Sequence, residues 1–393
     1  MLRFIHCLCL LLCLGLLPLS AGPRIVGKTP QTRPDYAQGV SGHAAAMLQQ
    51  GERSMLVMLG GCNFPERPAS EGGAKRYYAE VYATHYREGK DIKEWQHIGT
   101  LPEPLAYAGY VSYGNSLVLA GGKSTTGDLR RVQRLSLSAE GTLQIDSLPS
   151  LPEPRSGMGT ALVGSRLYLV GGAVGGILST SMISLDLERP EEGWRTEPAY
   201  PGAARLKVLA TGTKGRAGKP YIFAHTVFSQ VGTDNSLSVD MAHYAFDPEV
   251  ASWHILDRVD YRLAMEGNSF GGGHIYADPE DGTITLVGGV HTERFLPALK
   301  REQHMRIAQR MGDEDYLERL RAEAKDYLLQ EPKWYQFAPV LFMTSVEGTA
   351  SLTLEPSPHY AKADGALVEI APGRWLLLGG EIKPGVRTAN IIY

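Results

Sequence analysis

The stretch LVLAGG at residues 117–122 is a short apolar run that ends in two glycines, and it decides the fold because it recurs along the chain. The other copies are MLVMLGG (55–61), LYLVGG (167–172), PYIFAH (220–225, degenerate), ITLVGG (284–289) and WLLLGG (375–380). Their last residues are separated by 61, 50, 53, 64 and 91 positions. A period of roughly fifty residues, in a chain with 45 glycines, indicates repeated units of strands joined by tight turns.

Tryptophans and Leu-Pro pairs lie between the copies. Trp95, Trp194, Trp253 and Trp334 each follow a copy, and LPEP occurs at 101–104 and 151–154. The order of strand, Gly-Gly, strand and then a strand with tryptophan is typical of a kelch blade. Six copies therefore predict an all-β protein, a six-bladed kelch-type β-propeller over residues 23–393. An ordinary β-sandwich with glycine turns is the alternative, but it does not predict a period near fifty.

The two ends of the chain and one internal segment complete this architecture. Only residues 381–393 follow the last Gly-Gly, so we expect the N-terminal segment before Gly42 to supply the outer strand of a last blade shared by both termini. Leu317, Leu320, Ala324 and Leu328 have helical spacing, and Gly312 divides the segment. We predict a helical insertion at about 291–332, within one blade, that forms a lid or wall over one face. A simple surface hairpin is the alternative.

The first residues resemble an export signal. A basic start is followed by an apolar run from 4 to 17 and by small residues, so residues 1–22 are predicted to be a signal peptide and the protein periplasmic or secreted. An uncleaved anchor is the alternative, but the run is short for a bilayer, and we expect no stable membrane insertion after cleavage. Beyond this segment Cys62 is the single cysteine, which excludes an intrachain disulfide. A copper-radical oxidase on a kelch propeller would need a cysteine crosslinked to tyrosine and histidine ligands, and no matching pair of histidines stands beside Cys62.

Charge argues against nucleic acid as a partner. The net charge is -3 and the isoelectric point is about 6.4, so no basic surface for nucleic acid or anionic membrane is expected.

The last repeat carries the candidate site. Glu381 stands directly after a Gly-Gly, as Cys62, Lys123, Ala173 and Val290 do in other repeats, and it is the only acid among these positions. Pro384 and Gly385 fit the centre of a type II turn that would bring Glu381 near Arg387. In a regular hairpin positions 381 and 387 would face opposite sides, so convergence needs a looser loop. A rim salt bridge is the alternative. Arg155 and Arg205 precede inner strands and are expected at the same mouth.

The segment GGEIKPGVRT at 379–388 resembles the Gly-Glu-x-Lys-Pro-Gly-x-Arg-Thr motif of N-acetylneuraminate epimerases, the sialic acid mutarotases built as six-bladed kelch propellers. The helical segment after LVGGV resembles the insertion that this family carries just before its motif. GGCNFPERPASEGGAKRYYAEVY at 60–82 is similar to a loop of the cyclically permuted branch of the family. The resemblance spans roughly residues 42–393, and the degenerate fourth repeat departs from it.

The resemblance implies an exported sugar epimerase that opens and recloses the ring of N-acetylneuraminate by general acid/base catalysis. It implies Glu381 as the proton acceptor, Arg387 as a contact to the carboxylated sugar and Arg205 as a second cation. Asn63 and His359 occupy loop positions that would reach the mouth. The implied reaction needs no metal and no other cofactor. A non-catalytic kelch module that binds a glycan or a protein, and a lyase acting on uronic polysaccharides, remain as alternative functions.

Overall fold

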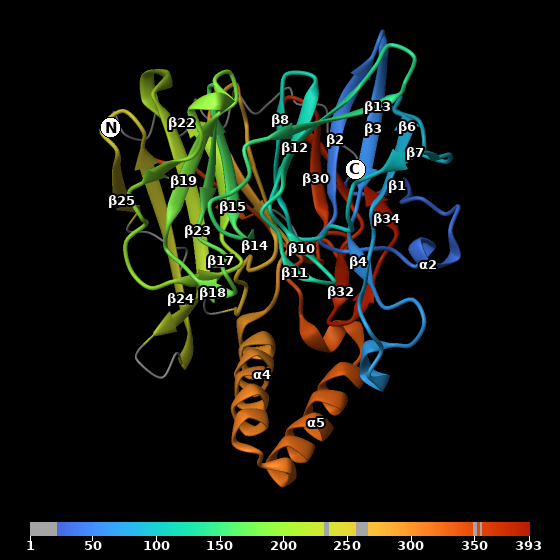
Figure 1. Cartoon of the computed structure of the whole chain (residues 1–393), viewed down its shortest axis with the longest axis vertical. Helices are drawn as coiled ribbons and strands as arrows, with labels where there is room; N and C mark the ends of the chain where they lie inside the picture. Colours follow the sequence, from blue (N-terminus) through green and yellow to red (C-terminus); the bar gives the residue numbers. More distant parts are fainter. Residues whose placement is uncertain (1–21, 232–235, 257–265, 349–351, 354–355) are drawn as a thin grey trace, which may run out of the picture.

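The computed structural model describes residues 22–231, 236–256, 266–348, 352–353 and 356–393. The segment predicted to be a signal, residues 1–22, lies outside this part of the chain except for Gly22. None of the helices described is both long and apolar enough to cross a membrane. Most of the regular structure is β-strand, and few helices accompany the strands (Figure 1).

The described strands form six larger antiparallel sheets, in each of which strands pair mostly in chain order. The first three sheets consist of β2 (Ala44–Gln50), β3 (Arg53–Leu59), β6 (Glu80–His85) and β7 (Gln96–Thr100); β8 (Gly109–Tyr113), β9 (Ser116–Ala120), β12 (Val132–Leu137) and β13 (Leu143–Leu148); and β15 (Gly159–Val163), β16 (Arg166–Val170), β19 (Met182–Asp186) and β20 (Arg195–Glu197). The fourth and fifth consist of β22 (Leu209–Lys214), β23 (Pro220–Val231), β24 (Ser236–Asp247) and β25 (Ser252–Leu256), with β21 (Arg205–Leu206) also on β23; and β26 (His274–Ala277), β27 (Ile284–Val287), β28 (Leu341–Thr344) and β29 (Leu352–Thr353).

The sixth sheet joins the two ends of the described chain. It has the order β1 (Ile25–Lys28), β34 (Asn390–Ile392), β31 (Arg374–Leu378) and β30 (Ala366–Ala371). β1 comes from the segment that the sequence predicted to supply an outer strand, and it pairs antiparallel with β34. The first strands of the sheets contact one another in the order β2, β8, β15, β22, β26, β30 and again β2. Each of these first strands therefore contacts the first strands of two other sheets.

Apolar residues on both faces of the second strands explain the repeated hydrophobic runs. In β3, Leu56 and Met58 are buried against Leu376 and Leu378 of the sixth sheet. Their neighbours Val57 and Leu59 face the second sheet instead, because successive side chains of a strand point to opposite faces. Similar clusters lie between the second and third, third and fourth, and fourth and fifth sheets.

The Gly-Gly pairs end the second strands where another backbone comes close. Gly60 has φ 65°, and a Cβ there would lie 2.4 Å from the carbonyl oxygen of Leu105. Gly121 has φ 59°, and its Cβ would lie 2.3 Å from the carbonyl oxygen of Arg155. Only glycine combines this backbone conformation with this proximity. The fourth copy lacks the glycines, and its strand β23 continues to Val231 instead of turning.

Small hairpins and two helices lie at one end of the sheets (Figure 1). The hairpins are β4 (Cys62–Asn63) with β5 (Arg76–Tyr77), β10 (Lys123–Ser124) with β11 (Gly127–Asp128), β17 (Ala173–Val174) with β18 (Ile177–Leu178) and β14 (Arg155–Ser156), and β32 (Glu381–Lys383) with β33 (Val386–Arg387). The helices α4 (Thr292–Met311) and α5 (Glu314–Leu329) connect β27 to β28. Gly312 ends α4 with φ 70°, and the Asp313 side chain caps α5 by accepting from the Tyr316 amide.

The short helical elements are peripheral. They are α2 (Pro34–Ala37) and the 3-10 turns η2 (Ala69–Glu71), η3 (Pro190–Glu192), η4 (Arg216–Gly218) and η5 (Pro332–Tyr335). Of these, η2 contacts α5, and η5 contacts β32. The turn η5, which follows α5, therefore packs against the hairpin that carries Glu381.

Candidate active site

A bulge sets the direction of Glu381. In the β32–β33 hairpin, Gly385 has φ 84°, the value that the third residue of a type II turn requires. The register pairs Glu381 with Arg387 and Lys383 with Val386, so β32 contains one extra residue, Ile382. This extra residue brings Glu381 directly opposite Arg387. The looser loop that convergence of the two side chains requires is therefore present.

The Glu381 carboxylate is held through one of its oxygens. Arg387 Nη1 lies 2.9 Å from Glu381 Oε1, and the Gly385 amide donates to the same oxygen at 2.8 Å. The Glu381 backbone pairs with Ala363, with N–O distances of 2.7 and 2.9 Å. Within the described residues, Oε2 makes no hydrogen bond or ion pair. The second oxygen is thus available to a ligand.

Glu381 borders a large cavity and Arg387 does not. The cavity has a volume of about 1950 Å³ and is lined by the first strands, by the small hairpins and by the facing sides of α4 and α5. The Glu381 side chain is 17% exposed and belongs to this lining, whereas that of Arg387 is 3% exposed and does not. Arg387 Nε donates to Ser41 Oγ at 3.1 Å, and its guanidinium lies 5.0 Å from the centre of the Phe64 ring. Burial lowers the Arg387 pKa, but Glu381 together with Tyr107, Cys62 and Asp364 outweighs this effect and raises the pKa above its ordinary value.

Charged side chains at the cavity are mixed, with cations in excess among the described residues. The cations are Lys75, Lys123, Lys207, Arg301, Arg306 and Arg310, and the acids are Glu302, Asp364, Glu369 and Glu381. This balance favours an anionic ligand. Within the described residues, no group of three or more His, Cys, Asp or Glu side chains is arranged to hold a metal ion.

Two histidines of the cavity wall are neutral at ordinary pH. Burial lowers the pKa of His43 to about 3 and that of His274 to about 4, and the nearby Lys362 ammonium contributes to both shifts. His274 Nε2 accepts from the Gly365 amide at 3.0 Å, so its proton is on Nδ1. Lys362 itself is buried, which lowers its pKa to about 7. The two histidines therefore add no charge to the cavity wall at ordinary pH.

The other predicted site residues lie away from the cavity lining. Arg205 is buried and donates to the Ala203 carbonyl and, at 3.2 Å, to the Tyr244 hydroxyl. Arg155 is also buried and donates to Leu169, Gly171 and Ser181. Both arginines satisfy groups of the sheets around them, which differs from the expectation that they face the mouth. His359 lies in a turn where its amide donates to Ser357 Oγ, and it does not border the cavity.

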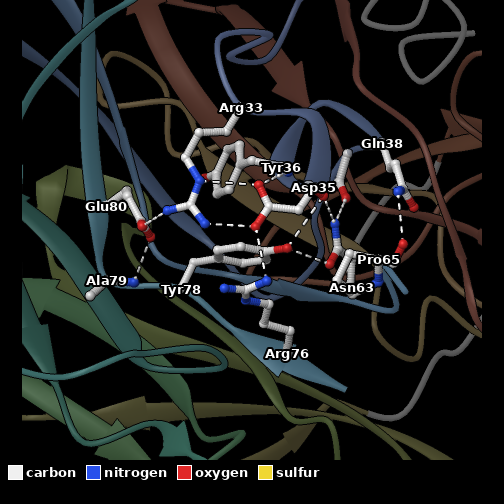
Figure 2. A network of polar contacts seen from close by, with 11 residues as sticks. Arg33, Asp35, Tyr36, Gln38, Asn63, Pro65, Arg76, Tyr78, Ala79 and Glu80 are labelled. Carbon is white, nitrogen blue, oxygen red and sulfur yellow. Dashed lines mark hydrogen bonds and ion pairs between the residues drawn. The ribbon is translucent and has the colours of Figure 1, made fainter. Parts of the chain in front are cut away.

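Asn63 belongs to a structural network instead of the cavity (Figure 2). Its Nδ2 donates to the carbonyl oxygens of Asp35 and Gly39 at 2.7 and 3.0 Å, and its Oδ1 accepts from the Tyr78 hydroxyl at 2.8 Å. The neighbouring Asp35 carboxylate binds both Arg33 and Arg76. Both N–H donors of the Asn63 amide therefore hold the N-terminal segment in place. The amide oxygen accepts from Tyr78 and keeps one further lone pair.

Comparison with known proteins places this site in a family. The model of the N-acetylneuraminate epimerase family matches residues 148–393, which include the Glu381 hairpin and both helices. The chain belongs to the N-acetylneuraminate epimerase family. A relative with that name from Brucella melitensis is 24% identical over 262 residues, covering 65% of this chain and 61% of its own. Another from Pasteurella multocida is 27% identical over 245 residues, covering 62% and 58%.

The match to the epimerase family is partial in length. This chain spans about 61% of the Brucella relative. The solved structure of YjhT superposes with a TM-score of 0.48 and 20% identity over 61% of each chain. Glu381, Arg387, Arg205 and His359 lie inside the segment that the family model matches, and Asn63 lies outside it.

Two features of the site in this epimerase family member were not recognised in the sequence. Lys383 Nζ donates to the carbonyl oxygens of Leu328 and Gln330, at 3.1 and 2.6 Å, and so ties the end of α5 to the Glu381 hairpin. Lys207 and Asp364 form an ion pair at the cavity wall. The lysine of the Glu-x-Lys-Pro-Gly motif was visible as a residue beside a turn, but its partners are about 55 positions away in the chain.

Proposed function

We propose that this protein catalyses the mutarotation of N-acetylneuraminate, with Glu381 as the general acid/base. Membership of the epimerase family and the names of the relatives support the reaction. The observation that carries the assignment of Glu381 is its carboxylate at the cavity wall, anchored through Oε1 and with Oε2 turned to no other described group. A fixed carboxylate with one available oxygen is what proton transfer to a bound sugar requires.

Ring opening needs two proton transfers and one broken bond, and ring closure reverses them. Glu381 Oε2 accepts the proton of the anomeric hydroxyl while the bond between the anomeric carbon and the ring oxygen breaks. The protonated Glu381 then delivers this proton to the ring oxygen, which gives the open-chain ketone and restores the carboxylate. After the carbonyl has presented its other face, Glu381 takes the proton of the same hydroxyl as that hydroxyl attacks the carbonyl carbon. Glu381 returns the proton to the carbonyl oxygen, and the other anomer results. A positioned acid/base of this kind contributes about 10² to 10⁴ in rate.

In this mechanism Arg387 is a positioning residue. It lies behind Glu381, outside the cavity lining, and its ion pair to Oε1 sets the orientation of the carboxylate. The role that the resemblance implies for Arg387, a direct contact to the sugar, would require movement of the hairpin. The buried contacts of Arg387 to Ser41 and Phe64 oppose such movement.

We also propose that the six sheets are the blades of a closed six-bladed kelch-type propeller with the helices inserted in the fifth blade. The cyclic contacts of the first strands and the pairing of β1 with β34 support this. The cavity would then be the mouth and channel of the propeller. Export to the periplasm or beyond is proposed from the pattern of residues 1–22, and the N-terminus of protein recovered from a periplasmic or culture fraction tests it.

The reaction is tested by proton NMR of freshly prepared α-N-acetylneuraminate. We expect the protein to accelerate the approach to the anomeric equilibrium, and we expect Glu381→Gln to remove about 10² or more of that acceleration while the sugar still binds. A wild-type protein that binds the sugar without any acceleration would instead identify a glycan-binding module. Glu302→Gln, at another acid of the cavity wall, is the matched control and should retain the acceleration.

A further inference from the structure

Six residues in equivalent positions form a ring around the cavity. Each stands two positions before the first strand of its sheet and has a left-handed backbone. They are Gly42 (φ 67°), Tyr107 (φ 55°), Gly157 (φ 60°), Lys207 (φ 55°), Gly272 (φ 71°) and Asp364 (φ 53°). All six line the cavity, and we call them the mouth ring.

Hydrogen bonds join members of the mouth ring across neighbouring sheets. Asp364 N donates to the Gly272 carbonyl at 2.7 Å, and Gly42 N donates to the Asp364 carbonyl at 2.6 Å. Tyr107 N then donates to the Gly42 carbonyl at 2.7 Å, and Gly157 N donates to the Tyr107 carbonyl at 3.1 Å. The left-handed conformation is therefore a property of the architecture, which every sheet must satisfy whatever its side chain.

Three members of the mouth ring are not glycine. Left-handed backbone is unfavourable for residues with a Cβ, and glycine fills the same position in the other three sheets without penalty. Non-glycine residues that keep such a conformation gather at functional sites, because the side chain itself is needed there. The left-handed backbone alone therefore does not explain why these three positions carry Tyr107, Lys207 and Asp364 instead of glycine.

The ring glycines make room for these side chains. A Cβ at Gly42 would lie 2.7 Å from the Tyr107 ring, and one at Gly272 would lie 2.9 Å from Lys207 Nζ. Lys207 Nζ binds both oxygens of Asp364, at 2.8 and 2.6 Å, over Gly272. An ammonium has three N–H donors, so two are used and one is left for a ligand.

Lys207 is better fixed than the other cations of the cavity wall. Its side chain is 23% exposed, so it is partly desolvated. Lys75 and Arg301 lie over aromatic rings, and Lys123, Arg306 and Arg310 are exposed at the surface. Asp364 directly follows Ala363, the backbone partner of Glu381, so the ion pair is attached to the strand end beside the candidate base.

We infer that Lys207 binds the carboxylate of the sugar acid, with Asp364 holding the ammonium in place. This inference rests on the proposed function, because it assigns the partner of the anionic group next to the carbon on which Glu381 acts. In N-acetylneuraminate the carboxylate and the anomeric hydroxyl are on the same carbon. A cation held by Asp364, next to the backbone partner of Glu381, would therefore orient that hydroxyl toward Oε2. Arg387 cannot do this from outside the cavity lining.

The test compares N-acetylneuraminate with its methyl ester, which lacks the negative charge. NMR measures mutarotation of both by wild type and by Lys207→Gly, a variant that restores the residue type of the neighbouring ring positions. We expect wild type to prefer the free acid, and we expect Lys207→Gly to lose about 10- to 100-fold in kcat/KM on the acid, mainly through KM, and little on the ester. Lys123→Ala, at another lysine of the cavity wall, should keep the preference.

Stability separates this role from a merely structural one. Replacement of both ion-pair partners, Lys207→Gly with Asp364→Gly, relieves two left-handed residues, so the thermal midpoint should not fall although the preference for the acid is lost. A retained preference in Lys207→Gly, or an equal loss in Lys123→Ala, overturns the inference. If wild type accelerates neither sugar, the proposed function fails instead. Binding of the free acid to Glu381→Gln, with and without Lys207→Gly, then tests carboxylate recognition alone.

Discussion

Replacement of Arg387 distinguishes the two roles that sequence and structure give this residue. The resemblance implies that Arg387 contacts the sugar, whereas the structure places it behind Glu381 with its side chain 3% exposed. Arg387→Met retains much of the apolar contact with Phe64 and removes the ion pair to Glu381 and the hydrogen bond to Ser41. If Arg387 acts through Glu381, its loss should matter only while Glu381 is present.

The size of the effect follows from the burial of the pair. Loss of one partner of a buried ion pair costs about 3–5 kcal/mol because the other charge is left uncompensated. The Glu381 side chain is 17% exposed and borders the cavity, so water can solvate it after the substitution. We therefore expect the free energy of unfolding to fall by about 2–3 kcal/mol. We expect the mutarotation rate to fall about 100-fold, because a displaced carboxylate loses its alignment with the sugar.

A double-mutant cycle provides the decisive measurement. Free energies of unfolding from urea titrations of Arg387→Met, Glu381→Gln and the double variant should show a coupling of about 1–3 kcal/mol. Calorimetric titration of N-acetylneuraminate into Glu381→Gln and into the double variant should give dissociation constants within about twofold of each other. A tenfold weaker affinity of the double variant would show that Arg387 contacts the sugar directly, and the positioning role would be refuted. Arg387→Lys, which keeps the charge without the planar fork, should be intermediate in rate.

Three further predictions concern the surroundings of the site. Lys383→Met removes the hydrogen bonds to Leu328 and Gln330, so the end of α5 should become more mobile. We expect faster hydrogen exchange of the amides within 314–329 and weaker binding of the sugar. Lys325→Met, on the exposed face of the same helix, should change neither. In urea titrations, Gly121→Ala should lower the free energy of unfolding by more than about 2 kcal/mol, since its Cβ would lie 2.3 Å from a carbonyl oxygen. Gly114 is equally left-handed but lies in open space, so Gly114→Ala should lower the free energy of unfolding by only about 1 kcal/mol. Stability should fall as the pH drops from about 6.5 toward 4, because the pKa values of His43 and His274 are lowered to about 3 and 4 and the unfolded chain alone takes up these protons. Each histidine contributes up to about 1.4 kcal/mol per pH unit to the change of the free energy of unfolding with pH. His43→Gln should remove one such contribution, whereas His85→Gln, at the surface, should leave the pH dependence unchanged.

The strand pattern was readable in the sequence because it depends on local residue types. An apolar run buried on both faces and closed by Gly-Gly marks five of the six second strands, as at Leu117 and Gly121, since no other residue fits at these glycines. The helices were readable from their spacing and from Gly312 for the same reason. By contrast, the direction of a side chain at a strand end depends on one inserted residue. The extra residue Ile382 places Glu381 opposite Arg387, and the residue types of this hairpin do not predict a bulge there.

The repeat pattern could not predict the hydrogen-bond and ion-pair partners of the candidate site residues. Arg205 was located correctly ahead of an inner strand, yet its guanidinium turns to neighbouring groups of its own sheet. Asn63 was predicted at a loop position that would reach the mouth, yet the N–H donors of its amide bind carbonyl oxygens of the N-terminal segment (Figure 2). Lys207 and Asp364 were overlooked because the mouth ring contains glycine, tyrosine, lysine and aspartate at one equivalent position. A shared backbone conformation with no shared residue type leaves no signal in the sequence.

Equivalent backbone positions recur in the repeated sheets, and the candidate site is distinguished by the side chains that a few of these positions carry. In several sheets the residue after Gly-Gly bridges to the residue before the mouth ring, as Cys62 does to Ser41, Lys123 to Ala106 and Glu381 to Ala363. The backbone of these positions is nearly equivalent, so the proposed chemistry depends on which one carries a carboxylate beside a buried guanidinium. The ring residue next to Ala363 is Asp364, which binds Lys207 from another sheet. The proposed base and the proposed cation therefore come from different repeats, and Asp364, next to the backbone partner of Glu381, links them. It follows that Lys123→Glu, in an otherwise Glu381→Gln protein, should restore no mutarotation in the proton NMR assay, because Arg387 and the Lys207–Asp364 pair have no counterpart beside position 123.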